Sequence, residues 1–191
     1  MPSQDNFERV QIASQSELWT WLEDHHDQQQ SVWLVTFKAA LREKYVSREE
    51  VLDALIAYGW IDGRRMKLDQ DRTMQLIAPR QQQIWAETYK NRAAKLVNEG
   101  RMKAPGRAAI ERSKAAGQWN ELDYVDALEE PPALQTALRA KNAKDWWDGA
   151  APSYRRNVLR WLATAKKDET KAKRISVIVS HAARGERVPH Y

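Results

Sequence analysis

The chain has 191 residues with 42% apolar side chains, enough for one or two domains with a hydrophobic core. It has no cysteine, which excludes disulfide bonds, thiolate metal sites and thiol catalysis. Residues 1–100 carry 13 basic and 15 acidic side chains, whereas residues 101–191 carry 18 and 11 and are net +7. This asymmetry permits an anionic partner for the C-terminal half but does not require one.

The first residues are polar and lack the apolar core of a secretory signal. No apolar run approaches the roughly 20 residues that a membrane-spanning helix needs. We therefore expect a cytoplasmic protein without a membrane span. The nine tryptophans indicate that large rings fill a core or line a binding cleft.

Helical and extended patterns alternate at the start of the chain. Residues 14–29 carry an apolar stripe behind serine caps, which predicts a helix. Residues 31–38 are a short β-branched and aromatic run, which predicts a strand. Ser47 and Glu50 have the spacing of a capping box, and the helix that they begin should end at Gly59.

A β-hairpin is predicted next, with strands at residues 60–68 and 73–80. Alternation places Trp60 and Asp62 on one face of the first strand. If position 62 paired with position 80, Asp62 and Arg80 would lie opposite each other. With residues 31–38, the hairpin gives a small antiparallel sheet of about three strands.

The rest of the chain has helical periodicity, beginning with residues 81–99. An acidic, proline-containing linker at residues 120–132 is the best candidate for a domain boundary. We expect the tail from Gly185 to be loosely held. The fold class is therefore α+β and mainly helical, with an α+β domain over residues 1–122. An all-helical module over residues 123–191 should pack on it.

Several short motifs resemble one bacterial family. They are Gly59-Trp-Ile-Asp-Gly63, Ala78-Pro-Arg80 with Trp85, Gly100-Arg-Met102, Pro152-Ser-Tyr-Arg-Arg156, Trp161-Leu162, Ala165-Lys166, Glu169-Thr170 and Arg174-Ile175. In this order they resemble the YdeI/OmpD-associated family, also called the bacteriocin-protection family, over residues 15–185. The resemblance implies a link to bacteriocin tolerance or to an outer-membrane porin. It implies no reaction and no catalytic residue.

The segment from Tyr58 to Arg80 combines glycines, aromatic rings, a carboxylate and arginines. We interpret it as part of a ligand pocket with aromatic walls and a few polar anchors. Two interpretations of Asp62 stay open: a charged anchor in the pocket, or a structural ion pair that fixes the hairpin. The candidate ligand-binding residues are Lys38, Tyr45, Trp60, Asp62, Arg64, Arg80 and Trp85.

Other chemistries have weak support. Asp69 and Asp71 suit a turn, and with Asp62 they are few for an oxygen-ligand metal site. The histidines lack zinc-protease spacing, and neither a nucleophile elbow nor a phosphate-binding loop is present. We expect no metal and no cofactor. Catalysis stays open as an alternative, with Asp62 as the base.

The basic C-terminal region offers another candidate partner. Arg155, Arg156, Lys171 and Arg174 are the residues that would contact nucleic acid or phosphate head groups. The alternative is a solvated helix surface, because no aromatic side chains interleave with them for base stacking.

The sequence thus favours a non-enzymatic bacterial stress or bacteriocin-tolerance protein. It would bind a small ligand or peptide in an aromatic, charge-anchored cleft. Binding of nucleic acid or an anionic surface is the first alternative, and an enzyme that uses Asp62 is the second. The ligand and the oligomeric state do not follow from the sequence.

Overall fold

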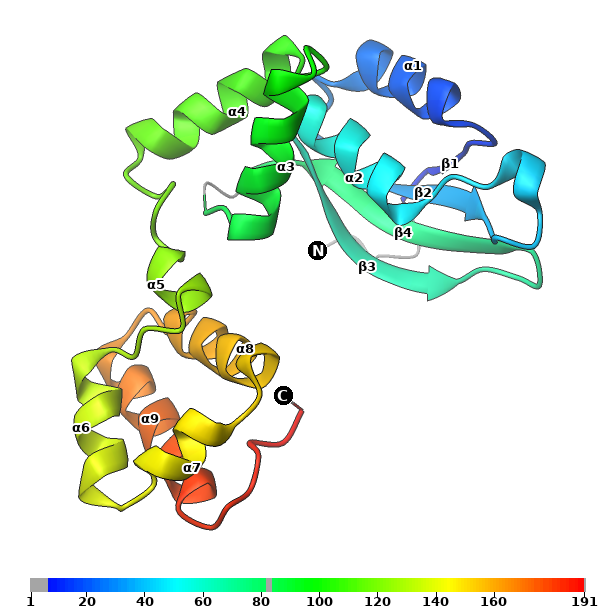
Figure 1. Cartoon of the computed structure of the whole chain (residues 1–191). Coiled ribbons are helices and arrows are strands. Elements are labelled where there is room, and N and C mark those ends of the chain that lie inside the picture. Colours follow the sequence, from blue (N-terminus) through cyan, green and yellow to red (C-terminus); the bar gives the residue numbers. More distant parts are fainter. Residues whose placement is uncertain (1–6, 82–83, 191) are drawn as a thin grey trace. The chain divides into compact units, whose positions relative to one another are not determined.

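The computed structural model describes residues 7–81 and 84–190. The chain forms two compact units, of which the first ends at Trp119 and the second begins at Asn120 (Figure 1). The first unit contains a sheet with helices, and the second is helical. The predicted fold class, α+β and mainly helical, is confirmed. The expected packing of a C-terminal module on the N-terminal domain stays a prediction.

The sheet of the first unit has four strands in the order β1-β2-β4-β3. Strand β4 pairs with β2 and with β3, and both pairs are antiparallel, as predicted. Strand β1 pairs with β2 in parallel, which makes the sheet mixed. Sequence reasoning missed β1 because three residues are too short to show a period. The strands are β1 Arg9–Gln11, β2 Val32–Phe37, β3 Trp60–Lys67 and β4 Arg72–Pro79.

One face of the sheet packs against helices (Figure 1). Helix α2 is central to this layer, because it contacts α1, α3, α4 and β3. Alternation along β2 sends Leu34 into this core, whereas Trp33 and Val35 form a smaller cluster with Met74. The helices are α1 Gln15–His25, α2 Arg48–Ala57, α3 Glu87–Asn98 and α4 Ala104–Ala115, and a 3₁₀ turn lies at Arg42–Lys44.

The two ends of α2 form as the sequence predicts. The Ser47 hydroxyl accepts the backbone N–H of Glu50, and the Glu50 carboxylate accepts the backbone N–H of Ser47. Gly59 follows the helix with φ of +73°, a conformation that only glycine adopts without strain. A Cβ on Gly59 would lie 2.8 Å from the carbonyl oxygen of Pro105. The start of α4 therefore rests directly on the end of α2.

Two predictions in this unit are wrong. Helix α3 begins at Glu87, not at residue 81; residues 84–86 precede it, and Gln82 and Gln83 lie outside the described residues. The hairpin register pairs Asp62 with Ile77, so Asp62 and Arg80 are not opposite each other. An irregularity between Asp62 and Arg65 shifts the register of β3 against β4.

The second unit buries large side chains from each of its four longer helices, among them Leu134, Trp147, Val158 and Ile178. The predicted linker contains a short helix. The tail is not loose, because Val188 is 4% exposed and its N–H donates to the Tyr154 hydroxyl at 3.0 Å. The helices are α5 Asp123–Asp126, α6 Pro132–Ala140, α7 Lys144–Gly149, α8 Pro152–Ala163 and α9 Asp168–Ala182.

Candidate functional site

Arg80 follows the last residue of β4, and its side chain is 5% exposed. The guanidinium lies over the Trp85 ring, 4.0 Å from the centroid, and 5.3 Å from the centroid of Tyr89. Its Nη1 donates to the carbonyl oxygen of Ile84 at 3.1 Å. Its backbone N–H donates to the carbonyl oxygen of Gly59 at 2.9 Å. Both the backbone and the side chain of Arg80 are thus held in place.

Asp62 lies near this cation without touching it. Its carboxylate accepts the hydroxyl of Tyr89, in a short hydrogen bond, and the side-chain amide of Gln75 at 3.0 Å. Among the described residues no arginine or lysine forms an ion pair with Asp62, so Asp62 does not fix the hairpin in that way. Burial raises the pKa of Tyr89 to about 12, and the hydrogen bond to Asp62 adds to this effect.

The two tryptophans predicted to line a cleft are buried in solid packing. Trp60 is fully buried and makes an edge contact with Trp21, at 5.6 Å between centroids. Trp85 is 1% exposed and packs against Trp119 at 5.3 Å. The Trp85 ring therefore lies behind Arg80, and neither indole offers an open face to a ligand.

Three other predicted residues lie away from Arg80. The Lys38 ammonium donates to the carbonyl oxygens of Asp69 and Gln70 at 2.9 and 2.6 Å, and so holds the hairpin loop. Tyr45 is 41% exposed and bridges to Phe37 through the backbone. Arg64 lies over the ring of Trp33, at 5.8 Å, beside the smaller apolar cluster of the sheet.

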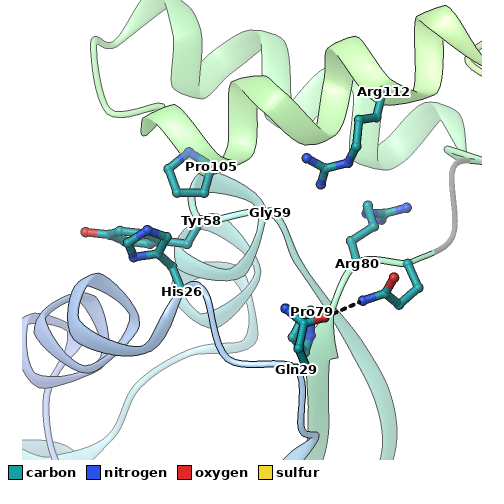
Figure 2. A pocket seen from close by; sticks show the side chains of 9 residues that line it. His26, Gln29, Tyr58, Gly59, Pro79, Arg80, Pro105 and Arg112 are labelled. Carbon is teal, nitrogen blue, oxygen red and sulfur yellow. Dashed lines mark hydrogen bonds between the residues drawn. The ribbon is translucent and has the colours of Figure 1, made fainter.

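Arg80 faces a cavity with a volume of about 370 Å³ (Figure 2). Side chains from separate parts of the first unit meet there, and none of them is acidic. Of the predicted ligand-binding residues, Arg80 alone lines it. Tyr58, Gly59 and Pro79 belong to the segment that was interpreted as part of a pocket but were not among its candidate residues, and the remaining lining residues come from parts of the chain without a local signal. The lining residues are His26, Gln29, Tyr58, Gly59, Pro79, Arg80, Gln81, Pro105 and Arg112.

The electrostatics of Arg80 follow from this setting. Burial lowers the pKa of its guanidinium from the usual value to about 10, although Tyr89 and Asp62 act to raise it. The side chain is therefore cationic at neutral pH, but its charge lacks the solvation that an exposed arginine has. Within residues 7–81 and 84–190, no three histidine, aspartate or glutamate side chains gather as metal ligands would.

The four basic residues predicted to contact an anionic partner are engaged with their own chain. Arg155 pairs with the buried Glu130 at 3.0 Å, and Arg156 lies 3.5 Å from Asp126. The other two pairings are Lys171 with Asp168, at 3.5 Å, and Arg174 with the Thr164 hydroxyl, at 2.6 Å. Contact of these four side chains with an anionic polymer stays a prediction.

Two family models match the chain. Residues 127–185 match the family described as bacteriocin-protection, YdeI or OmpD-associated. Residues 10–109, which contain Arg80 and the Gly59–Gly63 motif, match a domain of unknown function (DUF8412). No curated protein and no solved structure matches the chain. The expected resemblance is thus confirmed and located in the helical module. Since the other match spans more than half of the residues, the chain belongs to the family of that domain of unknown function and carries a C-terminal YdeI/OmpD-associated domain.

Proposed function

We propose that this protein is a cytoplasmic, non-enzymatic ligand-binding protein of the bacteriocin-tolerance type. The first unit holds a small ligand in the cavity beside Arg80. The observation that carries the proposal is a buried guanidinium, fixed from behind by aromatic rings, at the wall of an open polar cavity.

The size and lining of the cavity support this function. Its volume of about 370 Å³ lies at the lower end of the range that ligand pockets occupy, roughly 300–1,000 Å³. The polar groups of Arg80 and Gln81 can orient a ligand, while Pro79 and Pro105 supply rigid apolar surface. Trp85 thus has a different role from the one expected: it positions the cation and does not contact the ligand.

The immediate surroundings of Asp62 do not favour catalysis. A general base must reach its substrate with a free lone pair. The Asp62 carboxylate already accepts a hydrogen bond on each oxygen, from Tyr89 and Gln75, and it does not line the cavity where a substrate would lie. An enzymatic role would require the Asp62 side chain to leave its two partners and reach the cavity, whereas a binding role at Arg80 requires no such movement.

A screen of small polar metabolites and short peptides against the full chain tests the proposal. Tryptophan fluorescence is a suitable signal, because Trp85 lies directly under the Arg80 side chain. We expect at least one class of compound to bind the wild type and to bind Arg80→Met at least about tenfold more weakly. Arg64→Met is the matched control, because Arg64 lies outside the cavity.

Expression in a bacteriocin-sensitive bacterium tests the biological half of the proposal. The wild type and Arg64→Met should protect the cells, and Arg80→Met should not. Equal binding and equal protection by the two variants would remove the cavity from the account of function, as would a screen in which nothing binds.

A further inference from the structure

The cavity beside Arg80 contains a second guanidinium, that of Arg112 on α4. Figure 2 shows the two side chains directed toward each other from opposite walls. Among the described residues, neither guanidinium forms an ion pair with a carboxylate. Two like charges that face one cavity repel each other, and an anion between them would turn the repulsion into attraction.

Arg80 has unused donors although it is buried. One Nη1 bond, to the carbonyl oxygen of Ile84, is its single side-chain hydrogen bond within the described chain. Its Nε–H is fully enclosed and has no acceptor among the described residues, so the donors left for a ligand are the remaining Nη–H groups. A buried donor without a partner costs about 1–3 kcal/mol, and more when the group is charged. The nearest carboxylate, Asp62, is already bonded to Tyr89 and Gln75.

Arg112 also has no partner within residues 7–81 and 84–190, but it is exposed. Its neighbours one turn away on α4 are alanines, Ala108, Ala109, Ala115 and Ala116, so no carboxylate lies at the spacing that forms helical ion pairs. An exposed arginine gains most by extending into water. Its direction toward Arg80 therefore leaves a second cation at the mouth of the cavity.

The position of Arg112 depends on the close contact of α4 with α2. Gly106 makes this contact possible, because a Cβ there would lie 2.6 Å from the carbonyl oxygen of Ile56. With Gly59 against Pro105, this contact brings the first turn of α4 to the end of α2. The wall that carries Arg112 is thus set by backbone contacts.

We infer that the cavity binds the oxyanion group of a small molecule, a phosphate or a carboxylate, between Arg80 and Arg112. This inference rests on the proposed ligand-binding function and names the chemical class of the ligand. The planar fork of a guanidinium matches the oxygen spacing of both groups. The side chains that line the cavity include no aspartate or glutamate to repel an anion.

Titration of the full chain with four probes tests the inference. Inorganic phosphate, glycerol 3-phosphate and succinate carry the oxyanion, and glycerol is the neutral analogue. We expect at least one anionic probe to bind at low ionic strength and glycerol not to bind. The responses to phosphate, its ester and the dicarboxylate then identify the source of the oxyanion.

Variants on one helix provide the matched comparison. Arg112→Gln should raise the Kd for the bound anion at least about tenfold, because it removes charge-assisted hydrogen bonds. Arg107→Gln removes an exposed arginine of α4 outside the cavity, and it should change the Kd less than about twofold. Circular dichroism checks that both variants keep the fold.

The outcomes separate the two proposals. If a neutral compound binds in the cavity and Arg112→Gln binds it as well as the wild type does, the ligand-binding function stands and the oxyanion inference is wrong. Equal weakening by Arg112→Gln and Arg107→Gln would show general charge attraction and would also overturn the inference. If neither these probes nor the wider screen bind, both proposals fail.

Discussion

The free-energy cost of burying Arg80 predicts how the fold responds when the charge is removed. Arginine normally titrates at a pKa above about 12, so a pKa of about 10 means that the surroundings of Arg80, with burial as the largest cause, disfavour the charged form by a net of roughly 3 kcal/mol. The cost applies at every pH below about 10, where the side chain is cationic in both the folded and the unfolded protein. It is relieved only as the pH rises above that value.

Favourable contacts offset much of this cost. Each of the two rings, Trp85 and Tyr89, contributes on the order of 1 kcal/mol to a desolvated cation. The hydrogen bond to Ile84 contributes about as much again. The terms nearly cancel. Met fills similar space, and its sulfur packs well against aromatic rings. We therefore expect Arg80→Met to change the free energy of unfolding by less than about 1 kcal/mol.

Denaturant unfolding of the ligand-free chain, followed by tryptophan fluorescence, measures this change. Arg92→Met is the control, because Arg92 pairs with the buried Asp53 at 2.5 Å. Loss of a partner from such a pair costs more, about 2–3 kcal/mol here, since Lys95 and Arg101 still compensate Asp53. If Arg80→Met loses as much as Arg92→Met, then Arg80 is an architectural charge and the reasoning is wrong.

Three further predictions concern single contacts. Gly106→Ala should lower the free energy of unfolding by about 2–4 kcal/mol, because the added Cβ would meet backbone carbonyl oxygens of α2. Gly149 has open space around it, so Gly149→Ala should change this free energy by less than about 1 kcal/mol. Denaturant titrations measure both variants. Glu130→Ala should cost the second unit about 2 kcal/mol in the same assay, because it removes the shared acceptor of Lys144, Arg155 and the Trp147 indole N–H, while Asp148 still pairs with both cations. The exposed Glu129→Ala should cost almost nothing. Tyr89 has a folded pKa raised to about 12, so its contribution to stability is complete below pH ~10 and is lost as the pH rises through 12. Burial also raises the pKa of Tyr58 and of Tyr124, so ultraviolet absorbance of the phenolate should show one late-titrating tyrosine fewer in Tyr89→Phe than in the wild type.

Local signals in the sequence were sufficient where one element determines its own ends. The capping box at Ser47 and Glu50 and the stop at Gly59 depend on hydrogen bonds and dihedral angles within a few residues. They formed as predicted. The helix predicted from residue 81 does not form before Glu87, because Trp85 packs between Arg80 and Trp119 and keeps its segment out of the helix. Tertiary contacts there override local propensity.

The hairpin shows why side-chain pairing was harder to predict. The register depends on the loop, where Asp69 accepts the backbone N–H groups of Asp71 and Arg72, and on an irregularity within β3. Neither leaves a period in the sequence. Asp62 and Arg80 nevertheless lie near each other, since Tyr89 contacts both.

The aromatic cleft was expected from a sequence pattern that has two structural meanings. A tryptophan between glycines, beside a charge, is compatible with both a pocket wall and a core that carries a charge at its edge. Trp60 belongs to the core. Arg112 has no local signal at all, because an arginine among alanines on a surface helix has the pattern of a solvated face. The packing of α4 on α2 brings it to Arg80.

The distribution of charge along the sequence also does not locate the candidate anion site. The net +7 of residues 101–191 directs attention to the C-terminal helices, yet several of their arginines meet carboxylates of their own unit. Arg80 lies in the half with a net negative charge and has no such partner among the described residues. An ion pair within the chain satisfies a cation in place, whereas a buried cation without one keeps its affinity for an anion. Pairing and burial, and not the sum of charges, therefore decide where an anionic ligand gains most.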